Sequence, residues 1–160
     1  MTGETRLSEL YDRDFLLWTK EQAAALRRAK ASNLPLDWEN LAEEIDSLGK
    51  SLRRELRSQL RRILRHLFKL AASPAPPPRL GWQATIRAAR SELEHLLDES
   101  PSLKRDIDAL VAKLLPIAAE LAAGDLVRHG EPADAVWARL AQGGFTAEQV
   151  LEDWLPDPSA

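Results

Sequence analysis

The run Gly49-Lys50-Ser51 has the residue types that end a phosphate-binding P-loop. In that motif, glycines let backbone amides surround the phosphates, while the lysine and the hydroxyl contact the phosphates and their magnesium ion. The motif also needs a glycine five residues earlier, after a strand. This chain has Glu44 there, and the run lies inside a helical pattern. The run therefore predicts no nucleotide site.

Two other patterns contain groups that can bind metal or move protons. Glu92 and His95 have the Glu-x-x-His spacing of di-iron helical bundles, but such a site needs a second copy of the pair. His66 flanks the apolar side of its helix, where a histidine usually bonds to a neighbouring carbonyl or carboxylate. The chain has no cysteine, which excludes thiolate metal sites and cysteine nucleophiles. We therefore expect no cofactor and no metal.

The clearest charge pattern lies on a long predicted helix. Its first third is acidic, and eight Lys or Arg residues follow Asp46 with only Glu55 against them. Five of these bases share one face: Lys50, Arg54, Arg57, Arg61 and Arg65. The helix dipole favours acids early and bases late, but it hardly accounts for eight bases. This basic face is the candidate interaction surface.

Three interpretations of the basic face stay open. The bases could pair within the chain with the acids Glu92, Glu94, Asp98 and Glu99. They could bind the phosphates of a nucleic acid. The helix could also pair antiparallel with a second copy, acidic half against basic half. The net charge of −3 and the lack of interleaved aromatic residues favour internal or dimer pairing over nucleic acid.

Helices must position these groups, because apolar residues recur every three or four positions through most of the chain. The longest stripe predicts one helix from Trp38 to about Ala71, with Asp37 as its N-cap. At 1.5 Å per residue this helix is roughly 50 Å long. Thr19 with Gln22 predicts a capping box for an earlier helix that runs to about residue 31.

The remaining segments also read as helices. The prolines after Ser73 predict an extended polyproline loop over 73–79. Ser100-Pro101 predicts the start of a helix that continues past Pro116, and Thr146 with Gln149 predicts a capping box for a last short helix. No strand-like alternation occurs. We therefore predict an all-α fold, a single-domain helical bundle over residues 1–160 with shorter helices packed on the long one.

Composition is ordinary for a globular protein. The 160 residues are 44% hydrophobic and 29% charged, and no apolar run is long enough to span a bilayer. We expect a cytoplasmic protein with no membrane contact. The five tryptophans are spread over most of the predicted helices, which is typical of core anchors and not of a ligand cage.

Several runs of residues resemble one bacterial family. The first are Tyr11-Asp12-Arg13-Asp14-Phe15 with Trp18, and Asp37-Trp38-Glu39-Asn40-Leu41-Ala42-Glu43-Glu44-Ile45 with Ser47-Leu48-Gly49 and Ser51. Later ones are His66-Leu67 with Lys69, Trp82 with Ile86 and Arg90, Ser100-Pro101-Ser102-Leu103, Val150-Leu151 and Leu155-Pro156. Over nearly its whole length the chain is thus similar to the family catalogued as domain of unknown function twenty-nine.

This resemblance implies an all-helical bacterial protein and leaves the function open, because the family has no established activity. The matched polar residues Asn40, Glu43, Glu44 and His66 form the candidate family site. The chain departs from the family where members often carry an aromatic residue and it has Leu70, and also in its triple proline and its arginine-rich face. The resemblance therefore does not assign the basic face to the family as a whole.

The first functional hypothesis is a non-enzymatic helical module that self-associates or binds another protein through the long helix. A two-fold axis near Gly49 to Leu52 would place Glu39, Glu43 and Asp46 against Arg57, Arg61 and Arg65, with Leu52 and Leu56 as apolar contacts. The alternative is a nucleic-acid-associated protein that uses the basic face. A more distant third is a metal-dependent or hydrolytic enzyme around Glu43, Glu44 and His66.

Overall fold

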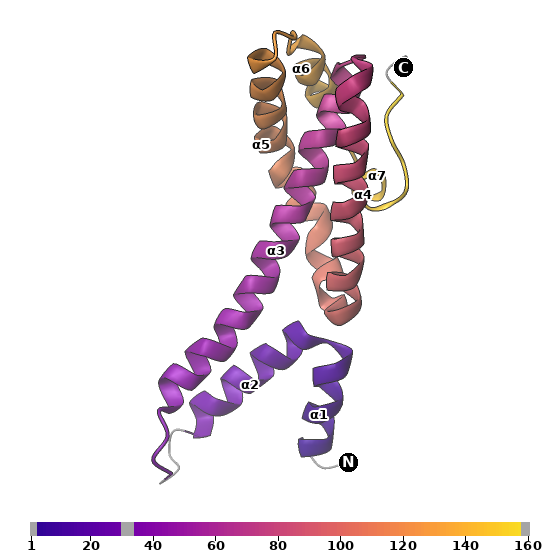
Figure 1. Ribbon diagram of the computed structural model, residues 1–160. Helices are drawn as coiled ribbons and strands as arrows, with labels where there is room; N and C mark the ends of the chain where they lie inside the picture. Colours follow the sequence, from indigo (N-terminus) through magenta and orange to yellow (C-terminus); the bar gives the residue numbers. More distant parts are fainter. Residues whose placement is uncertain (1–2, 30–33, 158–160) are drawn as a thin grey trace. The chain divides into compact units, whose positions relative to one another are not determined.

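The computed structural model describes residues 3–29 and 34–157, and the regular secondary structure within these ranges is helical throughout (Figure 1). The helices are α1 (Gly3–Arg13), α2 (Phe15–Ala29), α3 (Trp38–Ala72), α4 (Pro76–Glu99), the 3₁₀ helix η1 (Pro101–Asp106), α5 (Ile107–Arg128), α6 (Asp134–Ala141) and α7 (Ala147–Leu151). The predicted all-α fold is confirmed. None of the helices searched in the described residues could cross a membrane. The predicted helix end near residue 31 lies outside those residues.

Contacts divide the chain into two compact units. The first unit contains α1, α2, the first half of α3, the end of α4 and η1. The second contains the rest of α3 and α4, together with α5, α6 and α7. The single domain inferred from the sequence remains a prediction.

In the first unit, Asp14 fixes the start of α2. Its carboxylate accepts a hydrogen bond from the Leu17 amide at 2.9 Å and two more from the amide and hydroxyl of Ser102, at 2.7 and 2.9 Å. The predicted capping box at Thr19 is wrong, because Thr19 lies buried inside α2 and its hydroxyl donates to the Leu16 carbonyl. Threonine can make this backward bond within a helix, so a cap pattern alone does not mark a helix start.

Gly49 allows α2 and α3 to approach closely. A Cβ atom at this position would lie 2.7 Å from Thr19 Oγ1 and 3.2 Å from Leu16 Cδ1. Only a glycine fits there without displacing buried atoms of α2. The glycine of the Gly-Lys-Ser run is therefore a packing residue, which agrees with the rejection of a P-loop.

The long helix has the predicted extent. Asp37 caps its N-terminus by accepting a hydrogen bond from the Asn40 amide at 3.2 Å, and α3 then runs without interruption to Ala72 (Figure 1). Its second half enters the core of the second unit, where Phe68 is fully buried and packs edge-on against Phe145 at 4.9 Å between ring centroids.

The predicted polyproline loop over 73–79 is wrong from Pro76 on, because α4 begins at that residue and only 73–75 lie outside a helix. The three prolines occupy the first turn of α4, where backbone amides have no partner inside the helix, and their fixed φ suits a helical turn. Arg79 completes this junction by donating to the carbonyls of Leu70 and Ser73 at 2.7 and 2.6 Å.

The C-terminal helices follow the sequence prediction more closely. Pro116 lies inside α5 without ending it. Thr146 and Gln149 form the predicted capping box of α7. The guanidinium of Arg90 anchors this end of the chain by donating to the carbonyls of Gln149, Val150 and Trp154, at 2.8, 3.0 and 2.8 Å.

Candidate functional site

The candidate family residues do not gather at one place. Asn40 donates its side-chain amide to the Asp37 carboxylate at 2.6 Å and so supports the N-terminus of α3. Glu43 and Glu44 are exposed one turn later. His66 follows Glu44 by 22 residues of the same helix, which is about 33 Å at 1.5 Å per residue. These residues cannot act on one small substrate together.

His66 has the role that a flanking histidine usually has. Its Nδ1–H donates to the Arg62 carbonyl at 2.8 Å, and since that oxygen can only accept, the Nδ1 atom carries the hydrogen. Burial lowers the pKa of His66, and the charges of Lys69 and Arg65 add to that effect. Among the residues that the structure describes, no group of three or more His, Asp or Glu side chains could hold a metal ion.

The five bases of the predicted face divide into three kinds. Lys50 forms an ion pair with Asp46 on its own helix at 3.3 Å, and Arg54 donates to the Ser51 hydroxyl at 2.7 Å. Arg57 and Arg61 are exposed, and within the described residues no side-chain hydrogen bond or ion pair involves either of them. Arg65 is half-buried and binds Asp125 of α5.

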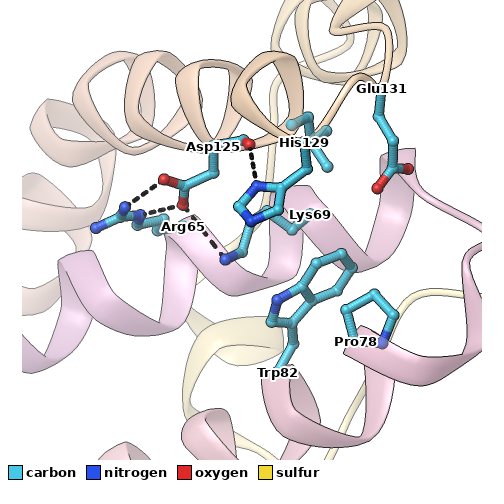
Figure 2. Close-up of a pocket in the computed structure, with 8 residues that line it drawn as sticks. Arg65, Lys69, Pro78, Trp82, Asp125, His129 and Glu131 are labelled. Atoms are coloured by element: carbon cyan, nitrogen blue, oxygen red, sulfur yellow. Dashed lines mark hydrogen bonds and ion pairs between the residues drawn. The ribbon is translucent and has the colours of Figure 1, made fainter.

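Asp125 is the centre of a cluster of three cations. Arg65 binds it through two hydrogen bonds of 2.7 and 2.6 Å, and the Lys69 ammonium lies at 3.3 Å (Figure 2). Arg128 adds a further hydrogen bond of 2.6 Å. Pairing within the chain therefore accounts for Arg65 and Lys69, but the acid is Asp125 and not one of the predicted acids of α4.

Contacts within the cluster and burial shift the pKa values of its members. Burial alone would raise the pKa of Asp125, but the hydrogen bonds from Arg65 and Arg128 and the charge of Lys69 hold it well below its usual range. Burial lowers the pKa of Lys69, and its contact with Asp125 opposes that shift. The hydrogen bond to Asp125 raises the pKa of Arg65.

A cavity of about 360 Å³ opens beside this cluster, between α3, α4 and the end of α5 (Figure 2). Its wall includes Trp82, with the Lys69 ammonium 4.9 Å from the centre of the indole ring, and His129, whose Nδ1–H donates to the Asp125 carbonyl at 2.8 Å. None of the motifs considered in the sequence analysis predicts this cavity.

One sequence signal could have found part of it. Asp125 continues the buried side of α5, which includes Val111, Leu114, Ala118 and Ala122. A charged residue in the apolar phase of a helix predicts a buried partner of opposite charge. The even spread of the tryptophans predicts Trp82 as a core anchor, but it is half-buried at a cavity wall, and Trp137 is 46% exposed.

Comparison with known proteins supports the fold and the family. A family model described as domain of unknown function DUF29 matches residues 10–155. The chain is also similar to a crystal structure described as an alpha-helical protein of unknown function from Rhodospirillum rubrum ATCC 11170. The two are 24% identical, 89% of each chain is covered, and the TM-score is 0.64. At this identity the likeness shows the fold alone. No curated protein matches the chain.

Proposed function

The chain belongs to the family of domain of unknown function DUF29, and from its own geometry we propose a non-enzymatic helical module that associates with a second copy of itself through α3. The observation that carries this proposal is the order of charges on one exposed side of that helix. At 100° per residue, Glu39, Glu43, Arg57 and Arg61 fall within about 40° of one another around α3. All four side chains are exposed.

These charges are symmetric about Lys50. In an antiparallel pair with its two-fold axis beside that residue, Glu39 faces Arg61 of the other copy, and Glu43 faces Arg57. Asp46 faces Arg54 in the same way. Lys50 meets its own counterpart at the axis, where its ion pair with Asp46 at 3.3 Å reduces the repulsion.

The structure does not support the apolar contact that the sequence predicts for the dimer. Leu56 is fully buried within its own chain, so it cannot contribute to a dimer, and Leu52 is half-buried. The exposed Leu41 and Leu48 lie on the opposite side of α3 from the charges. The association therefore depends on exposed ion pairs of about 0–1 kcal/mol each, so we expect a weak dimer that forms only at high protein concentration.

Light scattering at millimolar protein tests the proposal. We expect a mass that rises above one chain as the protein is concentrated, and that returns to one chain in high salt, because exposed ion pairs are screened. Arg57→Glu with Arg61→Glu should abolish the rise. Lys104→Glu with Lys113→Glu changes the net charge equally at two other exposed bases and should leave it unchanged.

The same variants, assayed for retention on duplex DNA, test the nucleic-acid alternative. If the chain stays monomeric at every concentration but is retained on duplex DNA at low salt, and the Arg57 and Arg61 reversals release it, the basic face binds phosphates and the dimer proposal is wrong. A protein that stays monomeric and is not retained on DNA would contradict both the dimer and the nucleic-acid hypotheses.

A further inference from the structure

The cavity beside Asp125 combines charge and flat apolar walls in the second unit. Its lining includes the cations Arg65 and Lys69, the rings of Trp82 and His129, and the carboxylates Asp125 and Glu131 (Figure 2). Its volume of about 360 Å³ lies at the lower end of the range for small-molecule sites, which combine apolar walls with a few convergent polar groups. No part of the proposed dimer face lines it except Arg65, which the proposed ion pairs of that dimer do not use.

The end of the cavity near Asp125 has an excess of positive charge. Two cations that line this end, Arg65 and Lys69, share the single carboxylate of Asp125, and the largely exposed Arg128 binds the same carboxylate from outside the cavity lining. The Lys69 side chain is only 10% exposed, so water compensates little of its charge. Its ammonium has three hydrogens, and the bond to Asp125 uses one of them. An anion at this end would take the remaining donors and offset the charge.

The middle of the cavity is suited to a planar group. The indole of Trp82 and the ring of Pro78 form part of its wall. Lys69 lies over the Trp82 ring, which fixes the indole against the charged end of the cavity. Figure 2 shows the ring of His129 with its bonded side at Asp125 and its other side toward Trp82 and Lys69. An aromatic ring in this space would contact both heterocycles.

Glu131 sets the orientation of an anionic ligand. Its carboxylate accepts a hydrogen bond from the Ser73 hydroxyl and lines the cavity away from Asp125 (Figure 2). A second negative charge there repels an anion. The negative end of a ligand is therefore directed to Lys69 and Arg65, and its uncharged end to Pro78 and Glu131.

We propose that this cavity binds a small aromatic carboxylate, with its carboxylate on Lys69 and Arg65 and its ring against Trp82. The ion pair between ligand and Lys69 supplies the specificity for an anion, and the indole supplies the specificity for a ring. This site is independent of the association through α3, so either can fail without the other.

Three probes test the ligand chemistry on the wild-type protein: benzoate, its uncharged analogue benzamide, and acetate, which lacks the ring. In ¹⁵N–¹H spectra, benzoate at millimolar concentration should shift the indole N–H signal of Trp82 and saturate, while the indole signals of Trp18 and Trp38 stay in place. Benzamide and acetate should produce no saturable shift of Trp82. Equal binding of benzamide, or no saturable shift with benzoate, would overturn the proposal.

A pair of variants tests the residue assignment. Lys69→Met keeps most of the buried stem and removes the charge, and it should weaken benzoate binding by about tenfold or more. Lys113→Met removes an exposed base of α5 and should leave binding unchanged. If Lys69→Met is too unstable to measure, Trp82→Leu replaces it. Since this variant lacks the indole probe, binding is followed at the backbone amide signals of Leu126 and His129, and the preference for benzoate over acetate should disappear. Unchanged benzoate affinity in a folded variant of either residue would contradict the assignment.

Discussion

Asp125 is an acidic residue on the apolar side of α5. Its contacts with three cations mean that the ionised carboxylate stabilises the folded protein. Its side chain is 12% exposed and accepts hydrogen bonds from Arg65, Lys69 and Arg128. Asp125→Asn removes the charge and leaves those three cations without their shared partner. At neutral pH we expect a loss of about 1.5–3 kcal/mol in the free energy of unfolding, measured by urea denaturation. Asp108→Asn, an exposed acid of the same helix, is the matched control and should cost little.

The pH dependence of that loss has a definite sign. The pKa of Asp125 is lowered in the folded protein, so its contribution to stability is present above the ordinary aspartate pKa of about 3.9 and is lost as the pH falls below it. The difference between the wild type and Asp125→Asn should therefore be constant near neutrality and shrink in acid. A difference that grows in acid would show that the cluster does not stabilise the ionised carboxylate.

Arg90 makes a prediction about the C-terminal segment. Its forked guanidinium reaches three carbonyls, those of Gln149, Val150 and Trp154, which a lysine ammonium cannot match in geometry. Arg90→Lys should therefore accelerate hydrogen exchange in α7 and in the residues up to Trp154. Arg87→Lys, an exposed arginine of the same helix, should not. Unchanged exchange in both variants would mean that Phe145 and Val150 hold this segment without Arg90.

At the scale of the helices, two glycines should respond in opposite ways to the same substitution. Gly124 lies inside α5 with open space where a Cβ would stand, so Gly124→Ala should raise the free energy of unfolding by about 1 kcal/mol through helix propensity. Gly49→Ala should lower it by about 1–2 kcal/mol, because the new methyl group meets the buried Thr19 and Leu16. Thermal unfolding of both variants measures the difference, and stabilisation by Gly49→Ala is incompatible with the packing described.

Helix periodicity predicted most of the elements, because it depends on residues close in sequence. The long α3, its cap Asp37 and the capping box of α7 all follow from local patterns. Two other local patterns gave wrong predictions, because each is compatible with more than one position in a helix. The prolines from Pro76 were read as a helix breaker although a first turn needs no amides, and Thr19 was read as a cap although it can bond backward within α2.

The residues of the cavity could not be assembled from the sequence in the same way. Lys69 and Asp125 are 56 residues apart, and Asp14 and Ser102 are 88 apart. Spacing along the chain carries no information about such pairs. Asp125 could be identified as a buried acid from its phase on α5, but its partners depend on how helices pack. Asn40, Glu43 and Glu44 lie far from His66 for the converse reason, since sharing one helix does not bring distant turns together.

At the scale of the whole molecule, the proposed association depends on what covers the charged side of α3. The structure assigns Arg65 to a partner inside the chain and leaves Arg57 and Arg61 exposed, with Glu39 and Glu43 on the same side of the helix. The charge order was visible in the sequence. Which bases are already satisfied was not, because Asp125 approaches Arg65 from another helix. The exposed charges on this side of α3 define the surface that a second copy would meet.

The most direct test of that association mixes two charge-reversed variants. Arg57→Glu with Arg61→Glu makes the face acidic, and Glu39→Arg with Glu43→Arg makes it basic. In sedimentation experiments at millimolar protein, each variant alone should be monomeric because like charges face each other, while the equimolar mixture should form a heterodimer at least as strong as the wild-type dimer. A mixture that remains monomeric, or single variants that dimerise as well as the wild type does, would contradict association through this face of α3.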